Sequence, residues 1–164
     1  MLAVLQLFAQ QLEDKVYKEH IQSVLLFPAG VTFDASLDAP VVPLLNGKPL
    51  VLLFDDLAYD PELYTAKLIH CDADWQKSQL KDNDFSPTFN EFNIQDYEYS
   101  VNTRIPYIHY RFELPRVTKS GNYILKVYRQ RDETDVILTK RFMVYEEIFK
   151  VGAAIVPPSQ TSDR

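Results

Sequence analysis

The sequence has little cysteine, histidine and glycine, and each shortage excludes a class of structure or chemistry. One cysteine in 164 residues excludes an internal disulfide. A cysteine nucleophile needs a histidine as its base, and with only three histidines the sequence offers few candidates for this role. Four glycines offer little material for a phosphate cradle, and the sequence contains neither a glycine-rich phosphate loop nor a nucleophile elbow. We therefore expect a protein that is not an enzyme and that uses no cofactor and no small-molecule substrate.

Long apolar runs and an excess of positive charge are missing as well. No run reaches the roughly 18 apolar residues of a spanning helix, so the sequence predicts no transmembrane helix. The net charge of −6 argues against nucleic-acid binding, which needs basic side chains to neutralise phosphates. Residues 55–98 hold eleven acidic residues against three lysines, whereas residues 116–145 hold seven basic against three acidic residues. This asymmetry indicates either two solvated faces of opposite bias or orientation toward a charged partner.

The sequence is rich in aromatic and β-branched residues, which are arranged in short runs. Residues 50–54 are five consecutive large apolar residues, which is typical of a buried strand. Residues 62–68, 108–114, 123–128 and 136–144 contain alternating apolar positions, and ten prolines mark turns and edges between the runs. This spacing predicts an all-β fold, an immunoglobulin-like (fibronectin-like) antiparallel β-sandwich of seven to eight strands with one long aromatic-containing loop.

The length suits a single domain with tails, and we place the sandwich at residues 17–148. Residues 1–16 are expected to be a leader. Its apolar start is either the remnant of a signal peptide or an ordinary first element. Residues 149–164 contain two consecutive prolines and polar residues, which is typical of a linker or a chain end.

Residues 76–93 have no usable period, and loops of this length in a compact domain are usually functional or mobile. Trp75 precedes this loop, which carries Phe85, Phe89 and Phe92 among polar residues. Such aromatic side chains can anchor a protein interface, stack on sugars, or complete the core at the open end of the sandwich. We take Trp75, Phe85, Phe89 and Phe92 as candidate partner-interface residues. A carbohydrate-binding module and a purely structural module are the alternatives.

The segment His70-Cys71-Asp72 with Asp74 invites a metal hypothesis, because each residue type can be a ligand. Neighbours on a strand point to opposite faces, so His70 and Cys71 cannot easily share one ion. No calcium-loop pattern is present either. The residues therefore predict a turn and a hydrogen-bonded histidine rather than a metal site. Strand parity directs His70 inward and Cys71 outward, unless a bulge reverses the two.

Seven segments together resemble one protein family. They are residues 17–26, 50–57, 69–75, 94–100, 106–112, 120–128 and 138–144, and the Ile-His-Cys-Asp-Ala-Asp-Trp motif at 69–75 is the most specific. The chain resembles the N-terminal domain of the type IX secretion system plug protein family of Gram-negative bacteria.

The resemblance implies a periplasmic protein with an immunoglobulin-like domain followed by a second β-rich domain. By the same resemblance, the protein associates with an outer-membrane β-barrel translocon and plugs its periplasmic opening by surface complementarity. The family has no catalytic residues to carry over to this sequence. The resemblance also favours the signal-peptide interpretation of the first residues.

Overall fold

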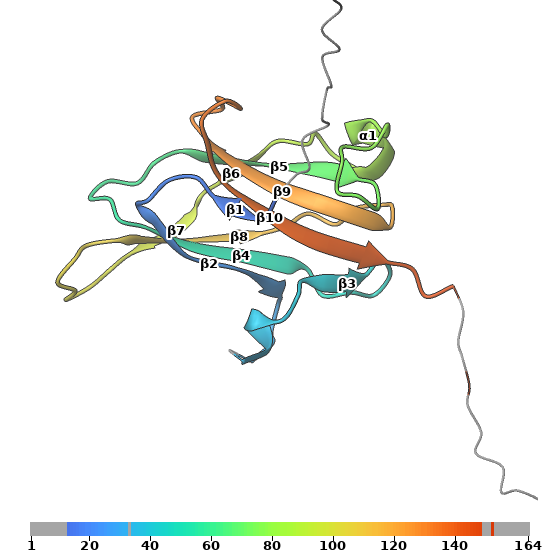
Figure 1. The fold of residues 1–164 in the computed structure, drawn as a ribbon. Helices are drawn as coiled ribbons and strands as arrows, with labels where there is room; N and C mark the ends of the chain where they lie inside the picture. The colour runs from blue at the N-terminus through green and yellow to red at the C-terminus, as the bar shows by residue number, and fades with distance from the viewer. Residues whose placement is uncertain (1–12, 33, 149–151, 153–164) are drawn as a thin grey trace, which may run out of the picture.

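The computed structural model describes residues 13–32, 34–148 and 152. Two β-sheets pack face to face, with a short 3-10 turn η1 (Asp34–Leu37) and a one-turn helix α1 (Asp82–Phe85) at the periphery (Figure 1). This architecture confirms the predicted β-sandwich. In the described part of the chain the strands are β1 (Lys15–Val16), β2 (Ile21–Pro28), β3 (Val41–Pro43), β4 (Leu50–Asp56), β5 (Tyr64–Cys71), β6 (Phe92–Ile94), β7 (Asp96–Tyr99), β8 (Ile108–Glu113), β9 (Gly121–Arg129) and β10 (Val136–Tyr145).

The strand order is that of an immunoglobulin-like sandwich. Sheet A runs β1-β10-β9-β5-β6, with β3 also paired to β10, and sheet B runs β2-β4-β8-β7. All pairs are antiparallel except β3 with β10, which is parallel. Sequence reasoning missed β1 and β6, because strands of two or three residues are too short to show a period. Pro43 ends β3 at the sheet edge, where the missing N–H of a proline is tolerated.

The predicted domain boundaries can be compared only in part. Strand β1 lies within the predicted leader of residues 1–16, where Lys15 pairs with Thr139 of β10. Residues 1–12 and nearly all of the predicted linker lie outside the described residues. In the part that is described, no helix is both long and apolar enough to cross a membrane.

The core forms where the inward faces of the two sheets meet. On β5 the alternation directs Tyr64, Ala66 and Leu68 inward, as predicted, and β9 contributes every second residue from Tyr123 to Val127. Strand β4 is apolar on both faces, because Val51 on its outer side is buried as well. The run at residues 50–54 is therefore the buried strand that its composition predicted.

One corner of the core explains a sequence motif, Gly-Asn-Tyr at 121–123. The Tyr123 hydroxyl donates a hydrogen bond to the Lys119 carbonyl at 2.8 Å, which is the tyrosine corner of immunoglobulin-like sandwiches. Gly121 has a φ of +145°, a conformation that other residues rarely adopt. A methyl group on Gly121 would also collide with the His70 ring. The glycine is thus required by both its backbone and its neighbour.

One carboxylate lies inside the sandwich. Asp56 is 1% exposed, and its Oδ2 accepts a hydrogen bond from the Tyr64 hydroxyl at 2.7 Å. Its Oδ1 lies 3.9 Å from Nε2 of His20. Burial, together with the hydrogen bond to Asp56, holds the pKa of Tyr64 well above its usual range. This polar pair adjoins the stacked rings of Phe54 and Tyr110, whose centroids are 4.9 Å apart.

The sandwich has two ends that differ in what they carry (Figure 1). The exit end holds the β3–β4 loop (44–49), the β8–β9 loop (114–120) and the end of β10. The hairpin end holds the β4–β5 loop (57–63) and the β7–β8 loop (100–107). Asp56, Ile108 and Tyr99 form one row across β4, β8 and β7, so both of these loops leave from the same end.

Candidate interaction surfaces

The Ile-His-Cys-Asp-Ala-Asp-Trp motif forms the end of β5 and a tight turn. Oδ1 of Asp72 accepts hydrogen bonds from the main-chain N–H groups two and four residues further on, at 3.0 and 2.9 Å. Trp75 adopts a positive φ of 61° in this turn. Its ring then lies beneath the Arg141 guanidinium, 4.4 Å from the ring centroid. The motif therefore serves to fold this turn back against sheet A.

His70 and Cys71 are both held in structural roles. Nδ1 of His70 lies 2.8 Å from the Ser78 hydroxyl and Nε2 lies 3.3 Å from the Ser120 carbonyl, while the ring packs edge-on against Tyr123. Cys71 is 2% exposed despite its outward parity, because the chain turns back and pairs beside it. Burial raises the pKa of its thiol to about 11, which disfavours the reactive thiolate.

The described residues contain no side-chain arrangement that supports the metal hypothesis. Among residues 13–32, 34–148 and 152, no group of three or more histidine, cysteine, aspartate or glutamate side chains is placed to hold a metal ion. Asp72 instead uses a carboxylate oxygen for the main-chain bonds of its own turn.

The four candidate aromatic residues are not brought together on one exposed surface. Phe85 on α1 is 1% exposed and packs against His70 and Tyr123, so it belongs to the core. Phe92 is partly buried, and its ring faces the opposite sheet. Trp75 is partly buried under Arg141, whereas Phe89 is 78% exposed. Of the four, Phe89 alone exposes most of its side chain to solvent.

The long loop is pinned along the edge of sheet A by a residue that sequence reasoning missed. The Asn90 side chain accepts a hydrogen bond from the Leu68 N–H at 3.0 Å and donates one to the Leu68 carbonyl at 2.7 Å. It thereby replaces a strand partner for β5 just before β6 begins. An asparagine in a polar loop carries no pattern from which this role could be predicted.

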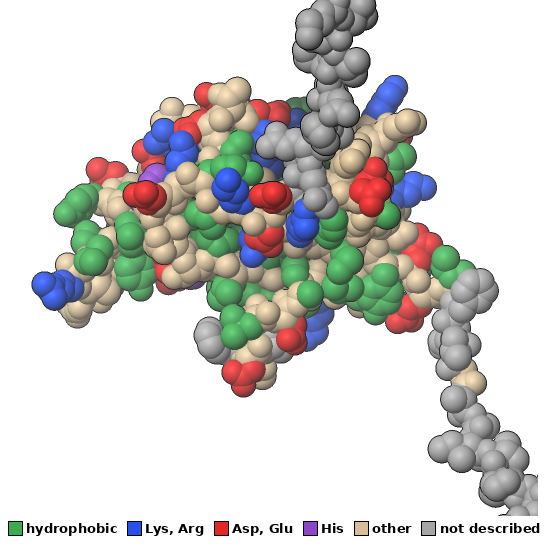
Figure 2. All heavy atoms as spheres, viewed as in Figure 1, with side chains coloured by type: hydrophobic (Ala, Val, Ile, Leu, Met, Phe, Trp, Pro, Cys, Tyr) green, Lys and Arg blue, Asp and Glu red, His purple; other side chains and the backbone are tan. Residues whose placement is uncertain are grey.

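The hairpin end exposes an apolar surface that sequence reasoning also missed. Two adjacent loops and the end of β7 contribute large apolar side chains that are 42–81% exposed, and Figure 2 shows hydrophobic side chains gathered where these loops project, beside a basic side chain. We call this surface the apolar tip. It consists of Leu57, Tyr59, Leu63, Tyr99, Val101 and Ile105. Contiguous exposed apolar side chains commonly mark interaction sites.

The apolar tip is supported from below by the core. The Tyr110 hydroxyl accepts a hydrogen bond from the Glu62 N–H at 2.8 Å, which ties the β4–β5 loop to β8. The Tyr97 ring packs against Tyr110 with centroids 5.7 Å apart. The fold places β7, which carries Tyr97 and Tyr99, at the edge of sheet B, from where the chain leads beyond the core.

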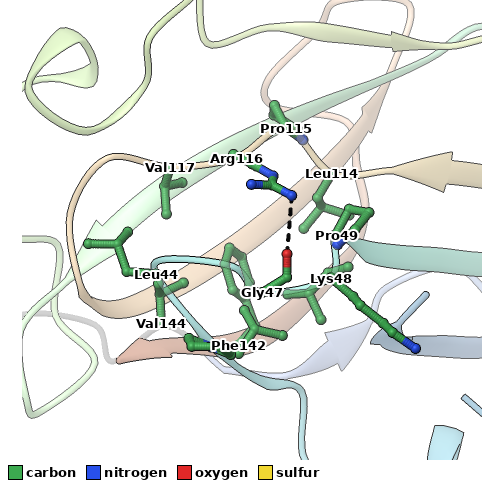
Figure 3. A pocket seen from close by; sticks show the side chains of 13 residues that line it. Leu44, Gly47, Lys48, Pro49, Leu114, Pro115, Arg116, Val117, Phe142 and Val144 are labelled. Carbon is green, nitrogen blue, oxygen red and sulfur yellow. Dashed lines mark hydrogen bonds between the residues drawn. The ribbon is translucent and has the colours of Figure 1, made fainter. Parts of the chain in front are cut away.

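A small pocket lies at the exit end (Figure 3). Its volume is about 40 Å³, and apolar side chains from β10 and from the two loops of this end surround it, among them Leu44, Val117 and Val144. Arg116 donates a hydrogen bond to the Gly47 carbonyl at 3.2 Å, so the two loops are joined across the pocket. The pocket is too small for a drug-sized ligand, and no nucleophile and base face one another in it.

Comparison with known proteins gives a family and one informative solved structure. The family model for the first domain of the type 9 secretion system plug protein matches residues 21–146. A crystal structure of a hypothetical protein from Parabacteroides merdae is similar, with a TM-score of 0.74 and 28% sequence identity. The match covers 80% of this chain and 33% of that protein, so the chain spans about a third of its length.

No curated protein matches the chain. The family match runs from the first residue of β2 to just beyond the end of β10, and so includes nearly the whole sandwich. The chain belongs to the family of the type 9 secretion system plug protein, as its first domain.

Proposed function

We propose that this domain is a non-enzymatic interaction module of a periplasmic protein, which associates with the outer-membrane type IX secretion translocon and plugs its periplasmic opening. Membership of the plug family suggests a role in type IX secretion. The observation that supports contact with a partner is the apolar tip, where six large apolar side chains from two loops and the end of β7 stay exposed. Burying such side chains against a complementary surface is favourable by about 25 cal/mol per Å².

The apolar tip is better suited to blocking an opening by surface contact than to catalysing a reaction. Tyr110 fixes the β4–β5 loop through a hydrogen bond to the Glu62 N–H and packs against Tyr97 of β7, so this part of the surface is preorganised and loses little conformational entropy on docking. Aromatic side chains such as Tyr59 and Tyr99 are frequent hot spots of protein interfaces. Arg104 is exposed between Val101 and Ile105 and can orient the contact through charge.

The test is affinity capture from envelope extracts of the source bacterium with the natural full-length protein as bait. We expect recovery of a large outer-membrane β-barrel protein. Val101→Glu should weaken this capture by about tenfold or more, because a charge would be buried at the contact. Val101 is exposed, as is Phe89 in the control variant described next. Each substitution should therefore change the free energy of unfolding by less than about 0.5 kcal/mol.

The matched control is Phe89→Glu, which places the same charge on the exposed residue of the aromatic loop. Unchanged capture with this variant supports the tip as the contact surface. Loss of capture with Phe89→Glu but not with Val101→Glu would instead assign the contact to the loop that the sequence suggested. Failure of the wild-type protein to recover any membrane protein would refute the proposed function.

A further inference from the structure

The exit end carries a second exposed apolar surface, around the point where β10 leaves the sandwich. Strands β3 and β10 run parallel there, with Val41 opposite Met143 and Pro43 opposite Tyr145. Val41, Met143 and Tyr145 are exposed at 38–42%, and Leu45 and Ile148 at 70–76%. Figure 2 shows hydrophobic side chains on this side of the molecule as well, near the departure of the chain. We call these five residues the exit patch.

The direction in which the chain leaves is set by hydrogen bonds. The Leu44 N–H donates to the Tyr145 carbonyl at 2.8 Å, which holds the last residue of β10 against the β3–β4 loop. One residue further, the Glu146 carboxylate accepts a hydrogen bond from the Ser120 hydroxyl at 3.0 Å. Any chain that continues past Ile148 therefore starts beside the exit patch and the pocket of Figure 3.

Two findings concern what can lie beyond a domain of this kind. The matching family model describes a first domain, and the similar Parabacteroides merdae protein is about three times as long as the matched part. From these and from the exit geometry we propose that the exit patch and its pocket form the docking surface for the next domain of the same polypeptide. Interfaces between domains of one chain commonly bury about 600–1,500 Å² and are partly polar.

The composition of the surface fits such a neighbour. Leu44, Val117 and Val144 around the pocket offer an apolar recess for side chains of the following domain. Arg116 and Lys48 lie at its rim, and Lys48 extends away from the pocket in Figure 3. These two basic side chains favour carbonyl or carboxylate groups on the facing surface. Docking here leaves the apolar tip, at the opposite end of the sandwich, free for a different partner.

Amide hydrogen exchange in two proteins tests this proposal: the present 164-residue chain, and the natural gene product that continues beyond it. We expect exchange in residues 44–49 and 114–120 to slow by about tenfold or more in the longer protein. Residues 100–107 at the hairpin end should exchange equally in both. Equal exchange at the exit end, or a natural product that ends at residue 164, would overturn the proposal.

Variants of the longer protein separate docking from other causes of protection. Leu45→Glu should restore fast exchange at residues 114–120, whereas Val101→Glu, the same change at the opposite end, should not. Protection that appears in the 164-residue chain only as its concentration rises would assign the surface to a second copy and refute docking of the next domain. Because Leu45 and Val101 lie at opposite ends, failure of this test leaves the capture experiment unaffected.

Discussion

Gly121→Ala is expected to destabilise the domain strongly, and the cost can be worked out from two independent observations. The φ of +145° at Gly121 is strained for alanine, and such strain costs on the order of 1–3 kcal/mol. The added methyl group would also meet the His70 ring, and overpacking of this kind costs about 1–3 kcal/mol. The ring cannot move aside freely, because both of its nitrogens are in hydrogen-bond contact. We therefore expect a loss of about 2–6 kcal/mol in the free energy of unfolding.

The assay is urea denaturation followed by far-ultraviolet circular dichroism and by the fluorescence of Trp75, the single tryptophan. Gly152→Ala is the matched control, because a methyl group there meets nothing within 4 Å. In the double variant His70→Ala/Gly121→Ala the collision is gone but the backbone strain stays. Its destabilisation should be smaller than the sum of the single effects by about 1–2 kcal/mol. A Gly121→Ala protein as stable as wild type, or strictly additive effects, would refute the reasoning.

Three further predictions concern titratable and hydrogen-bonding groups. Tyr64→Phe should cost about 1.5–3 kcal/mol in urea denaturation, because a buried carboxylate loses its hydrogen-bond donor, whereas Tyr99→Phe at the exposed tip should cost almost nothing. Burial raises the pKa of Tyr110 and Tyr128 to about 12. Their contribution to stability is therefore present below pH 10 and lost between about pH 10 and 12. In a pH titration, phenolate absorbance should rise at a higher pH in the native protein than in the protein unfolded by urea. The hydrogen bond from Lys67 lowers the pKa of Glu133 below its usual 4.5. The contribution of Glu133 to stability is therefore lost as the pH falls below about 4.5. In Glu133→Gln, the urea midpoint should decline less over this pH range.

Much of the sandwich could be predicted because its strands carry their own pattern. The alternation along β5, β8 and β9, and the apolar run of β4, each follow from residues within one strand. The Gly-Asn-Tyr sequence likewise lies within one strand, at the start of β9, where the Tyr123 hydroxyl closes the corner. The short strands β1 and β6 were missed because their pairing depends on β10 and β5, which lie far away in the sequence.

The roles of the loop aromatics depended on contacts that the sequence does not encode locally. Phe85 and Phe89 are four residues apart in the same polar loop, yet one is in the core and the other is exposed. The difference arises because α1 carries Phe85 against His70 and Tyr123, while Asn90 ties the chain just after Phe89 to the edge of β5. No periodicity within the loop distinguishes the two positions.

The sequence by itself determined the fold class, the family and the absence of the usual catalytic motifs, because these follow from local patterns and residue types. Only the tertiary structure decided which apolar side chains stay exposed, and it placed two groups of them, the apolar tip and the exit patch, at opposite ends of the sandwich. Tyr99 and Val101 alternate like core residues, but among the described residues β7 is the edge strand of sheet B and ends at Tyr99, and Val101 lies in the loop beyond it. Burial is set by what packs against a residue from elsewhere in the chain, and this information exists only once the sheets have assembled.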